Sequence, residues 1–560
     1  MNRWIIESIL PISFPYNSPF MDNIKILVSD DVSESGLEPL RAAGFKVEKR
    51  TGLKPDELRR IVRDYDGLVV RSETKVTAAL MDEAVRLRAI GRAGVGVDNI
   101  DVPAATSRGI IVMNAPDGNT MTTAEHTLAL LLALARRVPQ AHASLRDGKW
   151  ERKKFVGVEL RGKTLGVVGL GRIGRVVASR ARGFEMKVLA FDPFVAPEQA
   201  RDMELELAPL EEVCARADFL TVHTPLTAET RGIIGAREFA SMKPDVRIIN
   251  CARGGLIDER ALYAALKEGR VAGAALDVFE EEPPSQDNPL LQFDGVITTP
   301  HLGASTKEAQ EGVAVTVAEQ MRDYFQTGAL RGAVNAPALG AQELHTLSPY
   351  LVLAERLGRF QAQLLDEAVR EVRIEYAGEL AEMEAAPVTR AFLAGLLRDM
   401  SARVNVVNAF LIAEERGIAV TTSYTRGAGQ ELLPAITTRV LTTGGEQSVS
   451  GALFGSRISS DSSGSGDGRI TEINGFRIEA IPSGHMVVTR NRDVPGVIGR
   501  VGTILGAHGV NVSRFHLGRH ERGGEAMAVI ETDAPLDDET LDELLAFEHI
   551  VSARRIVLES

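Results

Sequence analysis

Residues 163–193 read KTLGVVGLGRIGRVVASRARGFEMKVLAFDP, and this stretch decides the fold of the chain around it. An apolar run of strand composition, residues 164–168, leads directly into Gly169-x-Gly171-x-x-Gly174, then a helix-forming segment and a second apolar run. In such a unit the first glycine permits a tight turn, the second lets a pyrophosphate approach the backbone, and the third lets the helix pack closely on the strand. The stretch therefore predicts a βαβ unit with a dinucleotide site at its glycine loop.

Asp192 ends the second apolar run, about 20 residues beyond the glycine loop, where a carboxylate accepts hydrogen bonds from the adenosine ribose hydroxyls. The same carboxylate would repel the 2′-phosphate that distinguishes NADP from NAD. The strand, the glycine loop, the helix and the terminal acid thus agree with one another, and NAD is the expected cofactor.

The length and charge of the chain limit its class. Its 560 residues suffice for roughly three or four domains, each with its own core. The formal net charge of −12 argues against a general nucleic-acid surface but leaves room for a local basic pocket that binds an anionic metabolite. Two cysteines cannot form a disulfide framework, and no apolar run is long enough to cross a membrane. We therefore expect a cytoplasmic protein without a membrane or nucleic-acid partner.

The first twenty residues, MNRWIIESILPISFPYNSPF, carry one arginine, a short apolar run and prolines at 11, 15 and 19. They lack the longer apolar region and the small-residue cleavage site of a signal peptide. A strand-like run begins just after Met21. We expect residues 1–20 to be a disordered leader or a mis-called start.

Between residue 21 and about residue 119, short apolar runs alternate with helix-forming segments, the pattern of a doubly wound parallel sheet. The expected buried strands are residues 24–28, 67–71, 89–92 and 110–113. Ligands of such sheets bind at the carboxyl ends of the strands. Arg71 stands at one of these ends, where a guanidinium can hold a carboxylate or a phosphate with two hydrogen bonds. A surface ion pair is the alternative interpretation.

Residues 122–137 are expected to form an apolar-rich helix, opened by the capping pattern TTAE at 122–125. We interpret His126 on this helix as a packed, hydrogen-bonded histidine rather than a ligand. The segment 146–154, RDGKWERKK, is strongly basic, and such a run is usually a solvated face. The alternative is that Arg152 or its neighbours help to bind an anionic substrate across a subunit boundary.

Four more apolar runs follow Asp192 and are expected to be parallel strands: residues 219–223, 247–251, 273–278 and 295–298. Polar residues come directly after each run. Because the carboxyl ends of parallel strands share one edge of a sheet, these polar residues are expected to converge on the edge that holds the nucleotide.

Three of these polar residues form a set suited to hydride transfer on a 2-hydroxy acid. Arg253 can hold the carboxylate with its guanidinium fork. His301 carries a side chain that takes up and releases a proton near neutral pH. A carboxylate beside that imidazole, Glu282, would favour the imidazolium and fix its tautomer. Each residue alone is equally well explained as a loop charge, but together they indicate catalysis.

Three strings resemble the D-2-hydroxyacid dehydrogenase family: NCARGGLIDE at 250–259, AALDVFEEEPP at 274–284 and TPHLGASTKEAQ at 299–310. More narrowly, Arg71-Ser72, RAGVGVDNID at 92–101 and the string HLGAST resemble the D-3-phosphoglycerate dehydrogenases of that family. The likeness extends from about Met21 to the C-terminus. It implies NAD-dependent oxidation of 3-phospho-D-glycerate to 3-phosphohydroxypyruvate, the first step of L-serine biosynthesis, by a homodimer or homotetramer.

The resemblance also implies roles for individual residues. The catalytic arginine, glutamate and histidine of the family fall on Arg253, Glu282 and His301. The implied substrate contacts are Arg71, Ser72, Asn119 and Arg253. The implied cofactor contacts are Gly169, Gly171, Arg172, Ile173, Gly174, Asp192, Thr224, Cys251, Asp277 and Gly303. One position departs from the family, because Val95 stands where relatives often carry threonine and cannot supply its side-chain hydrogen bond. No metal site is expected.

The resemblance divides the chain into domains. Residues 21–120 and 302–335 would form a discontinuous substrate-binding domain around the NAD-binding domain, residues 121–301. Residues 336–480 resemble the α+β intervening domain of longer relatives. Their strand-like runs at 448–454 and 470–480 flank RISSDSSGSGDG, which we interpret as a long hairpin loop rather than an interdomain linker. The fold class is thus two Rossmann-like domains followed by this domain and one more.

Residues 484–560 read strand, helix, strand, strand, helix, strand, the ferredoxin-like βαββαβ pattern. The turn DVPG and the string HGVNVSRF resemble an ACT domain, a module that senses small molecules. L-serine is then the expected effector: Asp493 would accept from its ammonium group, the backbone amides that open the helix at Gly496–Gly499 would bind its carboxylate, and Asn511 could contact either group. Asn491 stands where some serine-binding relatives carry tyrosine. The alternative is an assembly module without a ligand.

Two other functions stay open at this point. One is oxidation of a different 2-hydroxy acid on the same fold. The other is a nucleotide-sensing interaction protein, because some members of the family act as corepressors. The ACT-like C-terminal segment favours a regulated biosynthetic enzyme over both.

Overall fold

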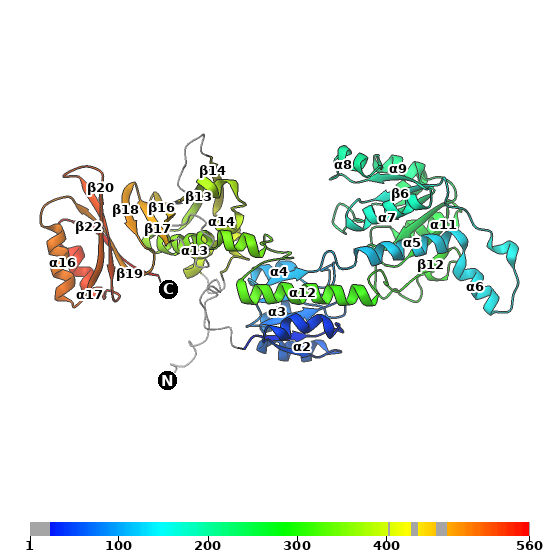
Figure 1. Cartoon of the computed structure of the whole chain (residues 1–560), viewed down its shortest axis with the longest axis horizontal. Coiled ribbons are helices and arrows are strands. Elements are labelled where there is room, and N and C mark those ends of the chain that lie inside the picture. Colours follow the sequence, from blue (N-terminus) through cyan, green and yellow to red (C-terminus); the bar gives the residue numbers. More distant parts are fainter. Residues whose placement is uncertain (1–22, 401–403, 427–434, 455–466, 559–560) are drawn as a thin grey trace.

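The computed structural model describes residues 23–400, 404–426, 435–454 and 467–558. Residues 1–20, expected to be a leader or a mis-called start, lie outside them. Figure 1 shows the sheets following one another along the molecule, with the C-terminal βαββαβ unit at one end and the glycine-loop domain at the other. Within the described ranges, no helix is both long enough and apolar enough to span a membrane.

The N-terminal domain is built on a five-stranded parallel sheet of order β2-β1-β3-β4-β5. Its strands are β1 (Lys25–Val28), β2 (Lys46–Lys49), β3 (Gly67–Val70), β4 (Ala89–Arg92) and β5 (Ile111–Asn114). Its connecting helices are α1 (Glu38–Ala42), α2 (Pro55–Ile61), α3 (Ala78–Glu83) and α4 (Val102–Ser107). The predicted doubly wound sheet is confirmed. Strand β2 escaped prediction because exposed and half-buried residues alternate along it, so it has no apolar run.

Helix α12 (Lys307–Thr327) covers one face of this sheet although it follows the whole glycine-loop domain in the chain (Figure 1). A Cβ on Gly67 would lie 2.8 Å from Cε of Met321, and one on Gly91 would lie 2.6 Å from its sulfur, so these glycines admit the helix. Beyond α12, the Asn335 side chain accepts from the Val112 amide at 2.9 Å. The N-terminal sheet is therefore completed by residues from beyond residue 302.

The glycine-loop domain has a seven-stranded parallel sheet of order β12-β11-β10-β9-β6-β7-β8. Its strands are β6 (Thr164–Val168), β7 (Lys187–Phe191), β8 (Glu206–Leu207), β9 (Phe219–Val222), β10 (Val246–Asn250), β11 (Val271–Leu276) and β12 (Val296–Thr298). The strand order reverses at β6 and β9, which is where such sheets bind their ligands. The second predicted Rossmann-like sheet is thus confirmed.

Helices pack on both faces of this sheet, as their shared apolar clusters show. One face carries α5 (Thr120–Arg136) and α7 (Arg172–Gly183), and the other carries α9 (Leu210–Arg216), α10 (Ala236–Ser241) and α11 (Glu259–Lys267). Two further helices are α6 (Val138–Arg146) and α8 (Pro197–Asp202).

The capping pattern predicted for α5 is wrong. The helix begins at Thr120, its N-cap is Asn119, and no side chain caps it. Thr123, predicted to lie in the cap, instead donates its hydroxyl to the carbonyl of Gly303 at 2.9 Å. A tertiary contact with the loop after β12 has therefore replaced the local hydrogen bond.

The third domain has a six-stranded mixed sheet of order β14-β13-β15-β16-β17-β18. Its strands are β13 (Val369–Ala377), β14 (Ala419–Thr425), β15 (Ala435–Thr442), β16 (Glu446–Phe454), β17 (Asp467–Ile473) and β18 (Phe476–Ala480). Its helices are α13 (Ala341–Leu364), α14 (Ala386–Leu397) and α15 (Ala409–Glu415). The hairpin of β16 and β17 is confirmed, although most of its loop lies outside the described residues. The single strand predicted at 470–480 is wrong, because Asn474 and Gly475 turn the chain there with φ of 49° and 84°.

The C-terminal domain is a four-stranded antiparallel sheet of order β20-β21-β19-β22, which confirms the ferredoxin-like prediction. Its elements are β19 (Gly484–Arg492), α16 (Val497–Ala507), β20 (Val512–Arg519), β21 (Glu525–Thr532), α17 (Asp538–Ala546) and β22 (Ile550–Leu558). One face of the sheet packs on its own two helices. The other face shares an apolar cluster with α13, so the third and fourth domains have one continuous core.

A pair of buried asparagines joins the third domain to the first. The Asn405 side chain donates to the carbonyl of Gly109 at 2.9 Å, and that of Asn408 donates to the carbonyl of Ser107 at 3.3 Å. Val407, between them, belongs to the apolar core of the N-terminal domain. Gly109 has φ of 69° and its Cα faces the Asn405 amide, so a side chain at this position would be both strained and blocked.

Candidate active site

Arg253 follows β10 and reaches across to the N-terminal domain. Its Nε donates to Oδ2 of Asp98 at 3.0 Å, in the loop between β4 and α4. Its Nη1 donates to the carbonyl of Ala252 at 2.7 Å. The arginine predicted to hold a carboxylate therefore lies where the carboxyl edges of the two parallel sheets meet.

His301 and Glu282 form a direct pair at the same edge, with 2.8 Å between Nδ1 and Oε2. Burial alone would raise the pKa of Glu282, but the hydrogen bond and charge of His301 and the amide of Phe279 outweigh it, so that pKa is lowered. The ionised carboxylate makes Nδ1 the donor and leaves Nε2 for a substrate. His301 has φ of 54°, an uncommon backbone conformation for a residue with a Cβ and one that is concentrated at functional sites.

Asp277 is fully buried and holds the loop that carries His301. Its carboxylate accepts from the Thr299 hydroxyl at 2.6 Å and from the amides of Leu302 and Gly303 at 2.7 and 2.8 Å. Nε2 of His126 lies 3.1 Å from Oδ1 of Asp277. Burial would raise the pKa of Asp277, but these partners lower it overall. The predicted contacts of Asp277 and Gly303 with the cofactor stay predictions, whereas their role in shaping the loop is visible.

Sequence reasoning missed one residue of this region, Arg92, the last residue of β4. Its Nε is buried and has no hydrogen-bond partner in the described part of the chain. Burial, and then the charges of Arg253 and Arg71, lower the pKa of Arg92 to about 10, while the charge of Asp98 acts in the opposite direction. The rule that selected Arg71, an arginine at the end of a buried strand, could have found Arg92.

Arg71 and Ser72 lie in the loop after β3, which Asp30 shapes. The Asp30 carboxylate accepts from the amides of Arg71, Glu73 and Thr74 at 2.6, 3.2 and 3.1 Å. The Arg71 side chain is half-buried and Ser72 is exposed. The structure therefore brings Arg71, Arg92 and Arg253 into one basic cluster, in which, after burial, the charges of Arg253 and Arg71 both lower the pKa of Arg92.

The glycine loop has the geometry predicted for it. Gly169 has φ of 98°, and a Cβ on Gly174 would collide with the carbonyl of Gly169, so the helix does pack tightly on the turn. A Cβ on Gly171 would meet nothing within 4 Å, which leaves the approach to α7 open. Asp192 accepts from the amides of Leu170 and Phe194 at 2.7 and 2.9 Å and is thus fixed beside the loop.

Two buried side-chain oxygens beside this edge, Oδ1 of Asn119 and Oγ1 of Thr224, find no partner among the residues the structure describes. Both residues were predicted to bind ligands, so these atoms fit polar groups of a dinucleotide and its substrate. His223, which precedes Thr224, likewise has an unpartnered Nδ1, and burial lowers its pKa to about 4.

The remaining predicted cofactor residues lie around the same loop. Arg172 opens α7 and pairs with Asp117 through 2.6 Å between Nε and Oδ1. Ile173 is half-buried in the first turn of the helix. Cys251 is buried, and burial raises its pKa to about 12, so its thiol stays neutral. Together the glycine loop, Asp192 and the unpartnered oxygens fit NAD.

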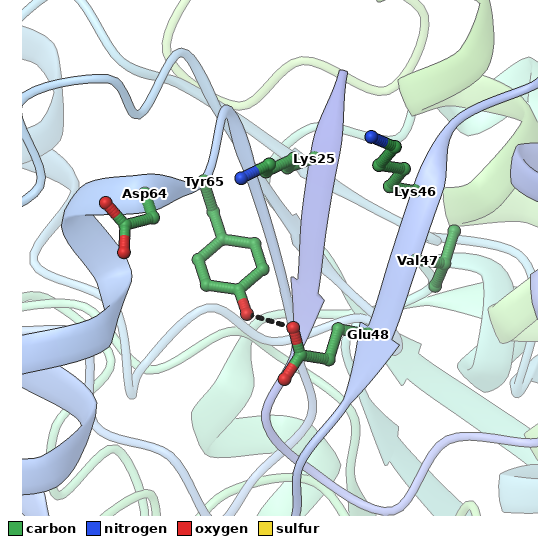
Figure 2. Close-up of a pocket in the computed structure, with 6 residues that line it drawn as sticks. All are labelled: Lys25, Lys46, Val47, Glu48, Asp64 and Tyr65. Atoms are coloured by element: carbon green, nitrogen blue, oxygen red, sulfur yellow. Dashed lines mark hydrogen bonds between the residues drawn. The ribbon is translucent and has the colours of Figure 1, made fainter. Parts of the chain in front are cut away.

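A cavity of about 530 Å³ lies elsewhere in the N-terminal domain, at the amino ends of β1 and β2. Figure 2 shows Lys25 and Lys46 in its wall together with Glu48 and Asp64. The Tyr65 hydroxyl donates to Glu48 at 2.5 Å. The wall of the cavity carries charges of both signs, and the cavity lies at the sheet edge opposite the one that carries Arg71 and Arg92. It takes no part in the candidate active site.

The residues predicted to bind an effector already have partners within the C-terminal domain. Oδ2 of Asp493 accepts from Arg519 Nη1 and from the Gly523 amide, both at 3.0 Å. The Asn511 side chain donates to Oδ2 of Asp533 at 2.7 Å. An effector has to replace at least one of these contacts.

In the described part of the chain, the basic segment after α6 forms no hydrogen bond or ion pair with Arg253, Glu282 or His301. Arg152 begins a short 3-10 turn, Arg152–Phe155, and is exposed. Trp150 is 78% exposed. Their predicted alternative role, across a subunit boundary, stays a prediction.

Comparison with known families gives three matches along the chain. Residues 128–303 match the NAD-binding domain of D-isomer specific 2-hydroxyacid dehydrogenases. Residues 346–459 match the intervening domain of D-3-phosphoglycerate dehydrogenase, and residues 485–549 match the ACT domain.

Individual relatives span nearly the whole chain. The D-3-phosphoglycerate dehydrogenase of Archaeoglobus fulgidus is 44% identical over 538 residues, which cover 96% of this chain and 100% of that protein. The D-3-phosphoglycerate dehydrogenase of Bacillus subtilis is 44% identical over 542 residues, 95% of this chain and 99% of the relative. A crystal structure of a protein from Thermus thermophilus is similar over 56% of this chain and 100% of its own, with 37% identity and a TM-score of 0.52.

Proposed function

This chain belongs to the family of D-3-phosphoglycerate dehydrogenases, and we propose that it oxidises the C2 hydroxyl of 3-phospho-D-glycerate to give 3-phosphohydroxypyruvate, with NAD as the hydride acceptor. The reaction is the first step of L-serine biosynthesis. The observation that carries the proposal is the His301–Glu282 pair, exposed at the carboxyl edge of the sheet that also carries Arg253 and the glycine loop.

Proton transfer falls to His301. Its Nδ1 is held by Glu282, so the neutral ring presents Nε2 as the base for the substrate hydroxyl. As the hydride leaves C2, the imidazolium that forms lies beside an ionised carboxylate, which stabilises its charge. Glu282 therefore orients the imidazole ring, and His301 accepts the proton.

The arginine cluster binds the two anionic ends of the substrate. Arg253 lies on the same sheet edge as His301 and holds the carboxylate and the developing carbonyl. Arg71 and Arg92, on the opposing edge, supply charge for the phosphate. NAD supplies the hydride acceptor, and the glycine loop and Asp192 would hold its pyrophosphate and its adenosine ribose.

A substrate comparison tests this assignment. We expect the purified protein to reduce NAD with 3-phosphoglycerate far more efficiently than with unphosphorylated 2-hydroxy acids. Arg71→Ala should raise KM for 3-phosphoglycerate much more than KM for an unphosphorylated acid, because a phosphate contact is lost. Equal losses on both substrates would make Arg71 structural, and a preference for another acid in the wild type would contradict the proposed substrate.

The C-terminal domain supports regulation by an amino acid, and we expect L-serine to be that effector. Its ammonium group would take the place of the Arg519 guanidinium at Asp493. The first amides of α16 and the Asn511 side chain would bind its carboxylate, aided by the helix dipole. Serine inhibits only if it binds one domain arrangement better than the other.

Calorimetry and inhibition assays test this regulation together. Serine should lower activity, and Asp493→Ala should relieve the inhibition without changing the uninhibited kcat. Asp542, exposed on α17, offers a matched Asp→Ala control that should stay inhibited. Absence of serine binding at millimolar concentration would leave this domain as an assembly module.

We further propose a homodimer or homotetramer in the cytoplasm. The support for assembly is a group of exposed apolar side chains on and after α6: Val138, Leu145, Trp150 and Val156. The support for a reducing compartment is that the two cysteines are buried and unpaired. Sedimentation analysis of wild type and Trp150→Glu tests the assembly, since the variant should dissociate more readily.

A further inference from the structure

The loop between β4 and α4 carries a carboxylate that no step above uses. Asp98 lies at the meeting of the two sheet edges, and its charge, with those of Arg253, Arg71 and Asp30, acts on the half-buried Arg92. Asp98 is therefore an acidic residue within the arginine cluster. Its side chain is 69% exposed, so folding alone does not require it to face inward.

The contact between Asp98 and Arg253 fixes the guanidinium plane. Nε of Arg253 donates to Asp98 and Nη1 donates to the carbonyl of Ala252, which holds the group at two points. Within the described residues, Nη2 forms no hydrogen bond. The free face of the guanidinium is thus the one that a substrate carboxylate can use.

Gly96, in the same loop, makes room for this arrangement. A Cβ at this position would collide with Nη2 of Arg253 and would lie 2.7 Å from Oδ2 of Asp98. The guanidinium therefore rests against the bare backbone of the N-terminal domain, although Arg253 itself belongs to the other domain.

We propose that Asp98 is a positioning residue for the reaction: from the N-terminal domain it orients Arg253 of the NAD-binding domain so that Nη2 faces the carboxylate of the substrate. The inference rests on the proposed role of Arg253. It assigns to the N-terminal domain a part in the alignment of a catalytic group that the NAD-binding domain carries. An exposed ion pair contributes little to stability, so the effect of Asp98 is on geometry.

Asp98→Asn tests the inference. The variant should lose about tenfold in kcat/KM, equally for 3-phosphoglycerate and for an unphosphorylated 2-hydroxy acid, because both present the carboxylate to Arg253. Its Tm and its Kd for NAD should equal those of wild type, and Asp98→Glu should recover part of the loss. Asp82→Asn, which breaks the Asp82–Arg108 ion pair on the surface of the same domain, is the control and should leave the kinetics unchanged. An unchanged kcat/KM in Asp98→Asn, or a lowered KM that marks Asp98 as a competing internal anion, would overturn the inference.

A double-mutant cycle separates the inference from the proposed function. Arg253→Lys keeps the charge but removes the Nε donor, so Asp98→Asn should cost less than about twofold in that background. A full tenfold loss there would show that Asp98 acts through another group. An active Arg253→Lys enzyme with wild-type kinetics would instead contradict the proposed role of Arg253. Gly96→Ala should reproduce the loss of Asp98→Asn, and an unaffected Gly96→Ala enzyme would contradict the close approach on which the inference depends.

Discussion

Two histidine–carboxylate pairs lie at the carboxyl edge of the NAD-binding sheet, and only one of them is arranged for chemistry. His301 and Glu282 are 2.8 Å apart, with side chains 48% and 39% exposed. His126 and Asp277 are 3.1 Å apart, with side chains 19% and 0% exposed. The nitrogen–oxygen distances of the two pairs are thus similar, and their exposure to solvent is what differs.

The remaining hydrogen bonds of each pair explain their separate roles. His301 uses Nδ1 for its carboxylate and keeps Nε2 for the substrate, whereas His126 uses Nε2 for both Asp277 and Thr299. Asp277 also accepts two backbone amides of the loop before α12. The buried pair therefore builds the loop after β12, and the exposed His301 that this loop carries is the residue to which we assign proton transfer.

The largest difference between the pairs should appear on removing each imidazole. His301→Gln should lower kcat by about 10²–10⁴-fold, the usual contribution of general acid–base catalysis, while NAD still binds. His126→Gln, the matched change in the buried pair, should lower kcat by no more than about tenfold, through the position of the loop. Steady-state kinetics and NAD titration measure both, and equal losses in the two variants would remove the distinction.

Removing each carboxylate should separate catalysis from stability. Glu282→Gln should lower kcat about tenfold or more, because the imidazolium loses its ionic partner. The Kd for NAD should stay at the wild-type value, because Glu282 contacts the imidazole and not the glycine loop. A wild-type kcat in this variant would show that Glu282 does not act through His301.

The corresponding change in the buried pair, Asp277→Asn, should act mainly on folding. Its new amide group would face donors that now bind a carboxylate, which should lower the free energy of unfolding by about 1–3 kcal/mol. Thermal denaturation should show a lower Tm for Asp277→Asn than for Glu282→Gln. A lower Tm for the Glu282 variant would reverse the assignment of the two roles.

The smallest effect is expected at a third pair, His508 and Glu543 in the ACT domain, which lies far from any cofactor residue. The hydrogen bond that His508 Nε2 donates to the Glu543 carboxylate raises the pKa of His508 above its ordinary 6.5. The stability from this pair should therefore be present in full below pH 6.5 and lost as the pH rises through the raised value. Glu543→Gln should lower the pKa of His508 in an NMR titration while kcat stays unchanged.

Much of this site could be predicted from the sequence because it lies at the ends of buried strands. The apolar runs placed Arg253, Glu282 and His301 at one edge, and the structure shows the His301–Glu282 contact directly. The glycine loop could be predicted equally well, because a separate steric requirement explains each of its glycines. Arg92 was missed although the same rule covers it, because its environment in the cluster depends on Arg253, far away in the chain.

Other structural features could not be predicted from the local sequence, because contacts with residues far along the chain determine them. Thr123, whose side chain was expected to cap α5, donates its hydroxyl to the carbonyl of Gly303 instead. The cofactor contact that the resemblance implies for Asp277 stays a prediction, but its hydrogen bonds to the loop after β12 depend on residues far along the chain. Strand β2 and the turn that separates β17 from β18 depend on tertiary pairing more than on apolar runs. Burial and competing partners, rather than propensity, account for each of these differences.

Helix α12 has a consequence for the synthesis of the protein. Ile26, Val69 and Met113 lie on the face of the N-terminal sheet that packs against α12. The ribosome, however, completes the entire NAD-binding domain before α12 emerges. At about 5–20 residues per second this interval lasts on the order of 10–40 s. During that time the nascent chain carries an uncovered apolar sheet face, the kind of surface that chaperones bind. The first domain to be translated can therefore close only after the second domain is complete.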